Sequence, residues 1–264
     1  MTVTSNISES VSVIIPFYNS SSTLRRALTS VYCQSIQVIE VIVVNDCSSN
    51  KETELALSII ADFARVRVIH HNRNMGPSAA RNSGIREAVG SFIALLDSDD
   101  FWMEDKLRIC LSTMNNLGVD FLGHNTTVGS ISRPSLIDML HGFQAVYRIN
   151  RLDIYISTSQ FAPSTVVFRK GAMPVIFDES IYLSEDYRLW GELVFLGYRL
   201  YKLKKCLSVR DEPHIKGNGL TGNVDRLRSA HILTHTYFVQ RGYVGALLGQ
   251  MATIFLKLKY IRHR

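Results

Sequence analysis

The first hundred residues alternate between short apolar segments, rich in β-branched residues, and segments with helical periodicity. The apolar segments are 11–15, 38–45, 66–70 and 91–96. Continuous apolar runs of this length are typical of strands buried on both faces. Strand–helix–strand alternation joins parallel strands by right-handed crossovers, so we predict an α/β fold. The expected core is a mostly parallel, Rossmann-like sheet with helices on both faces.

Apolar residues between these segments recur at i, i+3, i+4 and i+7, the spacing of one helix face. The two sets at this spacing are Leu24, Ala27, Leu28 and Val31, and Ala56, Ile59, Ile60 and Phe63. Beyond residue 105 the pattern is weaker. There we expect helices over 107–114 and 185–196 and strands over 165–169 and 199–207.

Composition narrows the functional class. The chain has 264 residues and a formal net charge of +6, which favours anionic partners without choosing among them. No basic stripe with interleaved aromatic residues is present, so we do not expect a nucleic-acid partner. The four cysteines include no CxxC pair, which argues against a cysteine metal site. Residues 1–10 are polar and lack the features of a secretory signal, so the predicted location is cytoplasmic.

An acidic cluster, Asp97-Ser98-Asp99-Asp100, follows the fourth apolar segment. Three carboxylates in four residues repel one another, and a divalent cation such as Mn²⁺ or Mg²⁺ would relieve that repulsion. Acidic residues also favour helix N-termini, so the cluster alone leaves both interpretations open. Its place at the carboxyl end of a predicted strand, where α/β sheets bind ligands, favours a functional site.

Two other predicted strands end at the same edge of the sheet. The first ends in Pro16-Phe17-Tyr18-Asn19 and the second in Asn45-Asp46-Cys47-Ser48. Asp46 could accept hydrogen bonds from a nucleobase or a ribose, or it could cap the helix that follows.

A glycine-punctuated segment, residues 72–84, follows the third strand. It contains Asn74, Gly76 and Gly84, and glycine permits backbone geometry or close approach that other residues resist. Arg81 offers a planar fork for a phosphate or for a carboxylate at the end of the sheet, and both roles are compatible.

Together these motifs resemble the family 2 glycosyltransferases with the GT-A fold, of the type that builds bacterial cell-surface polysaccharides. The resemblance covers about the first 110 residues. It implies a nucleotide-sugar (donor) site formed by Pro16, Tyr18, Asn19, Asp46, Asn74, Gly76, Arg81, Asp97, Ser98 and Asp99. By the same resemblance Asp46 contacts the nucleobase, Asp97 the ribose and Asp99 the metal. Many relatives have Asp-Asp-Gly-Ser where this chain has Asn45-Asp46-Cys47-Ser48, which puts the loop conformation in question.

Glu185 and Asp186 resemble the Glu-Asp motif of that family. If a helix begins near Ser184, then Asp186 shares one stripe with Trp190, Leu193, Val194 and Gly197. Asp186 would then stand at the rim of the core, where the helix N-terminus favours its ionised form. It is the predicted catalytic base, and Glu185 is predicted to orient it. Both residues could instead be ordinary first-turn acids.

The resemblance implies an inverting transferase that moves a sugar from a nucleotide-diphosphate donor, usually UDP- or dTDP-linked, to a saccharide hydroxyl. We expect donor binding in residues 1–110 and acceptor binding with the catalytic base in 111–229. Two other functions stay open at this point: a nucleotidyltransferase that makes activated sugars, and a non-catalytic module that binds nucleotides or glycans.

The C-terminal residues 230–264 are predicted to form an amphipathic helix with a basic end. The apolar run 243–256 is shorter than the ~20 residues that a spanning helix needs. Its stripe and the basic residues that follow suit a helix lying on an anionic membrane surface. We therefore expect a peripheral location at the inner face of the cell membrane, near a lipid-linked acceptor. The alternative is packing on the same domain or on a second subunit, as in a homodimer.

Overall fold

The computed structural model describes residues 9–129, 145–156, 160–173, 176–210, 224–245 and 249. In its N-terminal part four parallel strands pair in the order β3-β2-β1-β4. They span Val66–His70 (β3), Glu40–Asn45 (β2), Val11–Phe17 (β1) and Phe92–Leu95 (β4). All four were expected from the sequence. β2 and β4 are buried along their whole length, as apolar runs in a covered parallel sheet should be.

Beyond β4 the same sheet becomes mixed. It continues in the order β8-β6-β9-β5, with β7 paired to β9. These strands span Val167–Arg169 (β8), Phe121–Val128 (β6), Tyr201–Arg210 (β9), Phe101–Trp102 (β5) and Val146–Arg148 (β7). β8 runs antiparallel to both β4 and β6, and β9 runs parallel to β6. The expected strand at 165–169 is shorter than predicted, because a 3₁₀ turn, η1 (Pro163–Thr165), takes its first residue.

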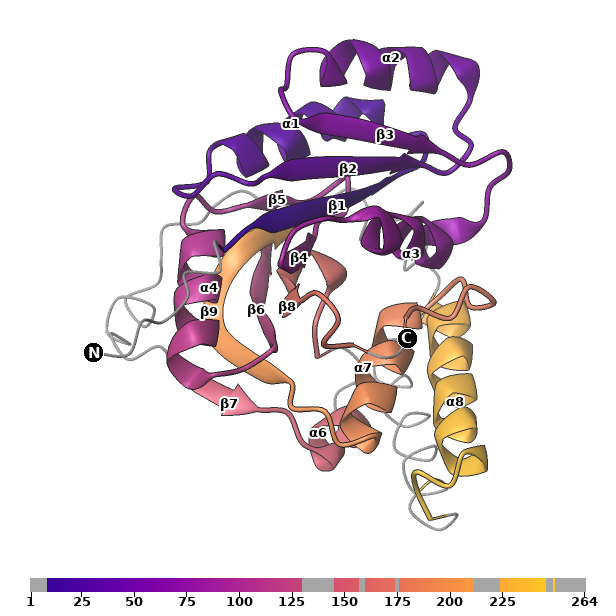
Figure 1. Ribbon diagram of the computed structural model, residues 1–264. Helices are drawn as coiled ribbons and strands as arrows, with labels where there is room; N and C mark the ends of the chain where they lie inside the picture. The colour runs from indigo at the N-terminus through magenta and orange to yellow at the C-terminus, as the bar shows by residue number, and fades with distance from the viewer. Residues whose placement is uncertain are drawn as a thin grey trace, which may run out of the picture.

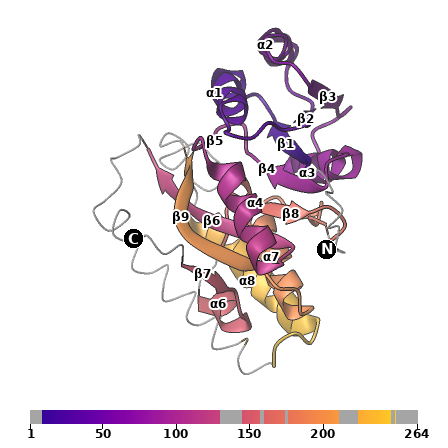
Figure 2. The same cartoon turned by 60° about the vertical axis from the view of Figure 1, so that its left-hand side comes forward.

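Helices cover both faces of the sheet, as expected (Figures 1 and 2). One face carries α1 (Ser21–Tyr32), α2 (Asn50–Ile60) and α4 (Lys106–Leu117). The other face carries α3 (Gly76–Glu87), α7 (Glu185–Phe195) and α8 (Val224–Gln240), together with the short α6 (Arg151–Ile156). Figure 1 shows α8 running beside α7, and the two helices are in contact. No helix in the described ranges is long and apolar enough to cross a membrane.

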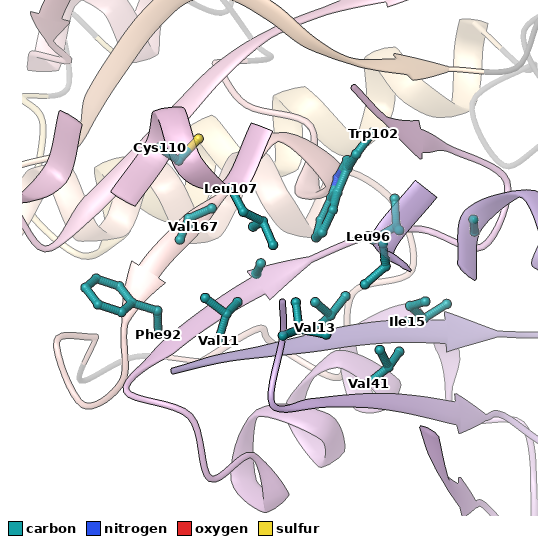
Figure 3. Packing of buried hydrophobic residues seen from close by; sticks show 14 of the residues in the cluster. Val11, Val13, Ile15, Val41, Phe92, Leu96, Trp102, Leu107, Cys110 and Val167 are labelled. Carbon is teal, nitrogen blue, oxygen red and sulfur yellow. The ribbon is translucent and has the colours of Figure 1, made fainter. Parts of the chain in front are cut away.

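Successive side chains of β1 point to opposite faces of the sheet, and each face has its own core layer. Val11, Val13 and Ile15 point toward the layer that holds Leu107 and Trp102, as Figure 3 shows. Ile14 points to the opposite layer, beneath α3 and α7. A strand with apolar residues on both faces can stand only in the middle of a covered sheet, which fixes β1 there.

The expectation of one helix over residues 230–264 is wrong in its first part, because α8 ends at Gln240 and Gly242 follows with a φ of 71°. Residues 246–248 and 250–264 lie outside the described residues. Within the described residues, the Tyr243 ring stacks on Phe195 with a centroid distance of 5.5 Å, and Val244 is buried. The first residues of this segment therefore pack on their own domain.

Candidate functional site

The carboxyl ends of the parallel strands meet at one edge of the sheet. Phe17 pairs with Asn45, and Asn45 pairs with His70, so β1, β2 and β3 end side by side. Figure 1 shows the arrowheads of β2 and β3 pointing to the same edge. The loops that follow these strands carry the residues expected to bind a donor.

The loop after β1 is tied to the loop after β2. The Asn19 backbone N–H donates to Ser48 Oγ at 3.0 Å, and Asn19 Oδ1 accepts from the Ser49 N–H at 2.9 Å. Pro16 lies within β1, and Tyr18 stands beside these bonds with a half-exposed ring. This part of the edge therefore presents an aromatic ring on a loop fixed by side-chain hydrogen bonds.

Asp46 is buried and anchors the start of α3. Its Oδ1 accepts from the Met75 N–H at 2.9 Å, and its Oδ2 accepts from the Gly76 N–H at 2.7 Å. His71 Nδ1 lies 2.7 Å from the same Oδ1. The alternative that Asp46 caps the helix directly after it is wrong, because Ser49 caps α2 through the Glu52 N–H. Asp46 instead fixes a helix thirty residues further along the chain.

Gly76 opens α3 at a φ of +86°, a backbone conformation that favours glycine. A Cβ there would lie 3.0 Å from the ring of Tyr182, so this half-exposed ring would have to shift to admit a side chain. Asn74, just before it, is exposed to solvent.

Arg81, on α3, joins the two halves of the chain. Its guanidinium donates to Asp97 Oδ1 at 2.7 Å and to Glu185 Oε1 at 2.8 Å. The arginine side chain is only 5% exposed, and the two carboxylates raise its pKa further. Arg81 therefore has the carboxylate role that the sequence left open, and it brings the Glu-Asp motif beside the acidic turn 97–100.

The acidic turn follows β4. Ser98 Oγ lies 2.8 Å from Ser20 Oγ of the first loop. Asp100 is buried, and burial together with the charges of Asp97 and Asp99 raises its pKa to about 8. The charge of Arg210, at the end of β9, opposes that rise. The raised pKa favours the protonated form of Asp100, and a proton there lowers the repulsion that three adjacent carboxylates would otherwise create.

The turn fits a magnesium-type ion. Such an ion takes one or two protein carboxylates and completes its shell with water and substrate phosphates. Asp99 is partly exposed, and the Asp97 side chain beside it is 25% exposed. The described part of the chain holds no group of three His, Cys, Asp or Glu able to bind a metal by itself. Asp99 and Asp97 are thus the two acidic side chains of the turn that are open to solvent, which matches the one or two carboxylates of such a site.

Asp186 lies in the first turn of α7, as expected. Trp190 and Leu193 on its stripe are buried, and Trp190 Nε1 donates to the Phe161 carbonyl at 3.0 Å. Gly197 lies beyond the end of the helix, in a left-handed conformation, so the predicted stripe is shorter.

The protonation of Asp186 differs from the expectation that the helix N-terminus holds it ionised. Its Oδ1 does accept from the Tyr187 N–H at 2.7 Å. Burial and the charge of Glu185 outweigh that bond and raise the pKa of Asp186 to about 7. A carboxyl group with this pKa can both take and release a proton near neutral pH.

Three residues that form hydrogen bonds at this edge of the sheet were not predicted from the sequence. His71 bridges Asp46 and Ser83, Ser164 accepts from the Asp97 N–H, and Arg26 donates to the Asp99 carbonyl. Ser164 and Arg26 lie far along the chain from their partners. His71 follows a strand end directly, which was the one available signal.

Comparison with known proteins agrees with this geometry. Residues 12–175 match the model of "Glycosyl transferase family 2". The succinoglycan biosynthesis protein ExoO of Rhizobium meliloti is 34% identical over 205 residues, 72% of this chain and 57% of that protein. An Escherichia coli protein, the UDP-Glc:alpha-D-GlcNAc-diphosphoundecaprenol beta-1,3-glucosyltransferase WfgD, is 33% identical over 134 residues, 48% of this chain and 52% of that protein. The chain thus spans little more than half the length of either relative.

Among solved structures, S. aureus TarS 1-349 in complex with UDP-GlcNAc is similar with a TM-score of 0.67. The match covers 86% of this chain and 66% of that one at 20% sequence identity. At this identity the likeness establishes a shared fold and carries no information on the substrate.

Proposed function

This chain belongs to glycosyl transferase family 2 and has the GT-A fold, and from that premise we propose that it transfers a sugar from a nucleotide-diphosphate donor to an acceptor hydroxyl. The observation that carries the proposal is the Arg81 bridge between Asp97 and Glu185. It holds the donor-binding turn and the carboxylates of α7 at one edge of the sheet. A non-catalytic binding module would need the donor-binding turn, but it would not need the carboxylates of α7 beside it.

In the proposed reaction the acceptor oxygen attacks the anomeric carbon, and its proton passes to the Asp186 carboxylate. The bond from that carbon to the diphosphate oxygen breaks, and the electron pair leaves with the diphosphate. One displacement inverts the configuration. Arg81 and Glu185 position Asp186 from the donor side, so the residues that bind and those that accept the proton share one scaffold.

Asp99 would hold Mn²⁺ or Mg²⁺ together with the donor phosphates, and Asp97 beside it would contact the ribose. Such an ion neutralises charge that develops on a leaving diphosphate. Asp46, Tyr18 and Asn19 would receive the nucleoside end of the donor, since they lie on neighbouring strand ends. We favour a UDP-linked donor because the E. coli relative is named for UDP-Glc.

The acceptor is proposed to be a lipid-linked saccharide in cell-surface polysaccharide synthesis. The names of the two relatives, one a succinoglycan protein and one acting on a diphosphoundecaprenol, support this assignment.

Asp186→Asn tests the proposed reaction. The asparagine keeps the shape of the side chain and cannot accept the proton, so we expect turnover to fall roughly a hundredfold or more. The donor affinity should stay unchanged. In the wild type the rate should rise with pH and reach half its maximum near 7, because only ionised Asp186 accepts a proton.

Glu185→Gln is the matched control in the same helical turn. It removes a neighbouring negative charge and leaves Arg81 with one carboxylate partner, and both changes lower the pKa of Asp186. The midpoint of the pH profile should therefore move below that of the wild type. Wild-type turnover in Asp186→Asn would remove this residue from the reaction.

Contact with the inner membrane surface is proposed for the C-terminal residues. They combine an apolar run with Lys257, Lys259, Arg262 and Arg264. Because Tyr243 and Val244 already pack on the domain, the informative deletion is residues 250–264. It should weaken binding to vesicles with anionic lipid more than binding to neutral vesicles, because it removes both the basic residues and part of the apolar run. Equal binding to anionic vesicles before and after the deletion would contradict the proposal.

A further inference from the structure

Ser164 lies in the 3₁₀ turn η1 and is completely buried. The pairing of Ala94 with Val167 brings this turn beside the end of β4. The bond from the Leu95 N–H to the Val166 carbonyl, 3.3 Å long, continues the contact toward the acidic turn. A residue from the mixed half of the sheet therefore reaches the donor-binding edge.

Ser164 contacts three residues of the segment that carries the acidic turn. Its Oγ accepts from the Asp97 N–H at 3.0 Å, and its hydroxyl is hydrogen-bonded to the carboxyl group of Asp100. Its carbonyl accepts from Trp102 Nε1 at 2.8 Å. One buried side chain and its own carbonyl thus hold both ends of the turn and the strand that follows.

The two side-chain bonds of Ser164 require a hydroxyl group. A hydroxyl both donates and accepts, so it can serve the Asp97 N–H and the Asp100 carboxyl at once. Alanine can do neither, and it would leave the Asp97 N–H and the Asp100 carboxyl without this buried partner, at a cost to the free energy of the folded turn.

Asp97 occupies the centre of a longer chain of contacts. Ser164 accepts from the backbone N–H of Asp97, and Arg81 donates to the carboxylate of Asp97. The second terminal nitrogen of Arg81 donates to Glu185. A displacement of the Asp97 backbone would therefore change both the donor-binding turn and the approach of the Glu-Asp motif.

We propose that Ser164 is a positioning residue, which holds the turn Asp97–Asp100 in the conformation that binds the metal and the diphosphate of the donor. This inference deepens the proposed function and rests on it. Ser164 itself does not touch the reacting atoms.

Two measurements on the full chain test the inference, with Ser164→Ala compared with Thr165→Ala. Thr165 is the adjacent buried hydroxyl, and in the described part of the chain it donates only to the Ala162 carbonyl within its own turn, at 2.7 Å. The first measurement is hydrogen–deuterium exchange of the peptide covering residues 95–102, without ligand. The second is calorimetric titration with UDP in the presence of Mn²⁺.

We expect Ser164→Ala to speed exchange in this peptide and to weaken Mn²⁺-dependent UDP binding about tenfold, the scale of one buried hydrogen bond. Thr165→Ala should lower the melting temperature to a similar extent and leave UDP affinity unchanged. Unchanged exchange in Ser164→Ala, or faster exchange with wild-type affinity, overturns the positioning role. Equal weakening in Thr165→Ala would also overturn it, because general packing would then explain the loss.

Trp102→Phe provides a second variant if Ser164→Ala does not fold. This substitution keeps an aromatic ring and removes the bond to the Ser164 carbonyl. Both the exchange rate and the UDP affinity should therefore change in the same direction as in Ser164→Ala, but by a smaller amount. No change in either measurement would count against the inference. If the wild type itself binds no UDP with Mn²⁺, the UDP assignment within the proposed function is wrong, and the exchange measurement alone then decides whether Ser164 holds the turn.

Discussion

Lys106 is a completely buried lysine in the first turn of α4. Its Nζ lies 3.4 Å from the centroid of the Trp102 ring and has no hydrogen-bond partner in the described part of the chain. Burial lowers its pKa from 10.5 to about 7. Lys106→Met replaces the ammonium group with an apolar side chain of similar length that adapts to its surroundings.

The expected change in the free energy of unfolding follows from the shift in the pKa of Lys106. A difference of 3.5 units between 10.5 and 7 corresponds to about 5 kcal/mol, at about 1.4 kcal/mol per unit. The folded pKa is the lower one, so the unfolded chain binds more protons between these values and wild-type stability rises with pH there. Lys106→Met should therefore stabilise by up to about 5 kcal/mol at pH 7 and below, and by about 2 kcal/mol at pH 9. The contact with Trp102 favours the ammonium form and reduces both figures.

Urea unfolding at pH 6, 7.5 and 9, followed by circular dichroism, measures this gain. Lys51→Met is the matched control, since Lys51 is exposed on α2 and its replacement should change stability little at any of these values. The reasoning fails if Lys106→Met destabilises the fold, or if its gain does not shrink as the pH rises. Either result would mean that the amine makes a favourable interaction in the folded state that outweighs its burial.

Two further predictions concern the donor side. Asp99→Asn should reduce turnover strongly and leave the ligand-free melting temperature unchanged, because the side chain serves the ion; full activity of the wild type in excess chelator would contradict this. Asp46→Ala should weaken binding of UDP by calorimetry and also lower the melting temperature, because the carboxylate anchors α3. A lower melting temperature with unchanged UDP affinity would assign Asp46 to anchoring alone.

The parallel half of the fold was predictable because its signals are local. Each strand from β1 to β4 is an apolar run, and crossover helices with clear periodicity join the first three. The mixed half gives weaker signals, since β7 and β8 have three residues each. So short a strand is defined by its partners rather than by its own sequence, and those partners are distant along the chain.

The same distinction separates what could be predicted about the site from what could not. The strand-end motifs are sufficient to assign Asp46, Asp97 and Asp99 to one edge of the sheet. Their hydrogen-bond partners could not be found this way, since Arg81 and Glu185 are 104 positions apart and Asp97 and Ser164 are 67 apart. The raised pKa of Asp186 is likewise a product of tertiary burial, which a helix-terminus argument does not include.

The loop after β2 contains Cys47, at the position where the family resemblance leads us to expect glycine. Cys47 has a left-handed conformation, with a φ of 60°, which is a backbone region that favours glycine. Such a conformation costs a residue with a side chain roughly 1–2 kcal/mol. Bonds on either side hold it in place: the Ser48 N–H donates to Asn45 Oδ1 at 3.0 Å, and the Ser49 N–H donates to Asn19 Oδ1.

Left-handed residues gather at this edge of the molecule. Four non-glycine residues in the described ranges have a positive φ, and three of them, Asn19, Cys47 and Ser184, lie in the loops of the candidate site. Strain of this kind persists only where the surrounding contacts over-determine the backbone. Here each strained residue lies within two positions of a residue to which we assign a role in binding or proton transfer: Tyr18, Asp46 and Asp186. The fold therefore accepts a loss of stability at the positions where loop geometry orients functional side chains.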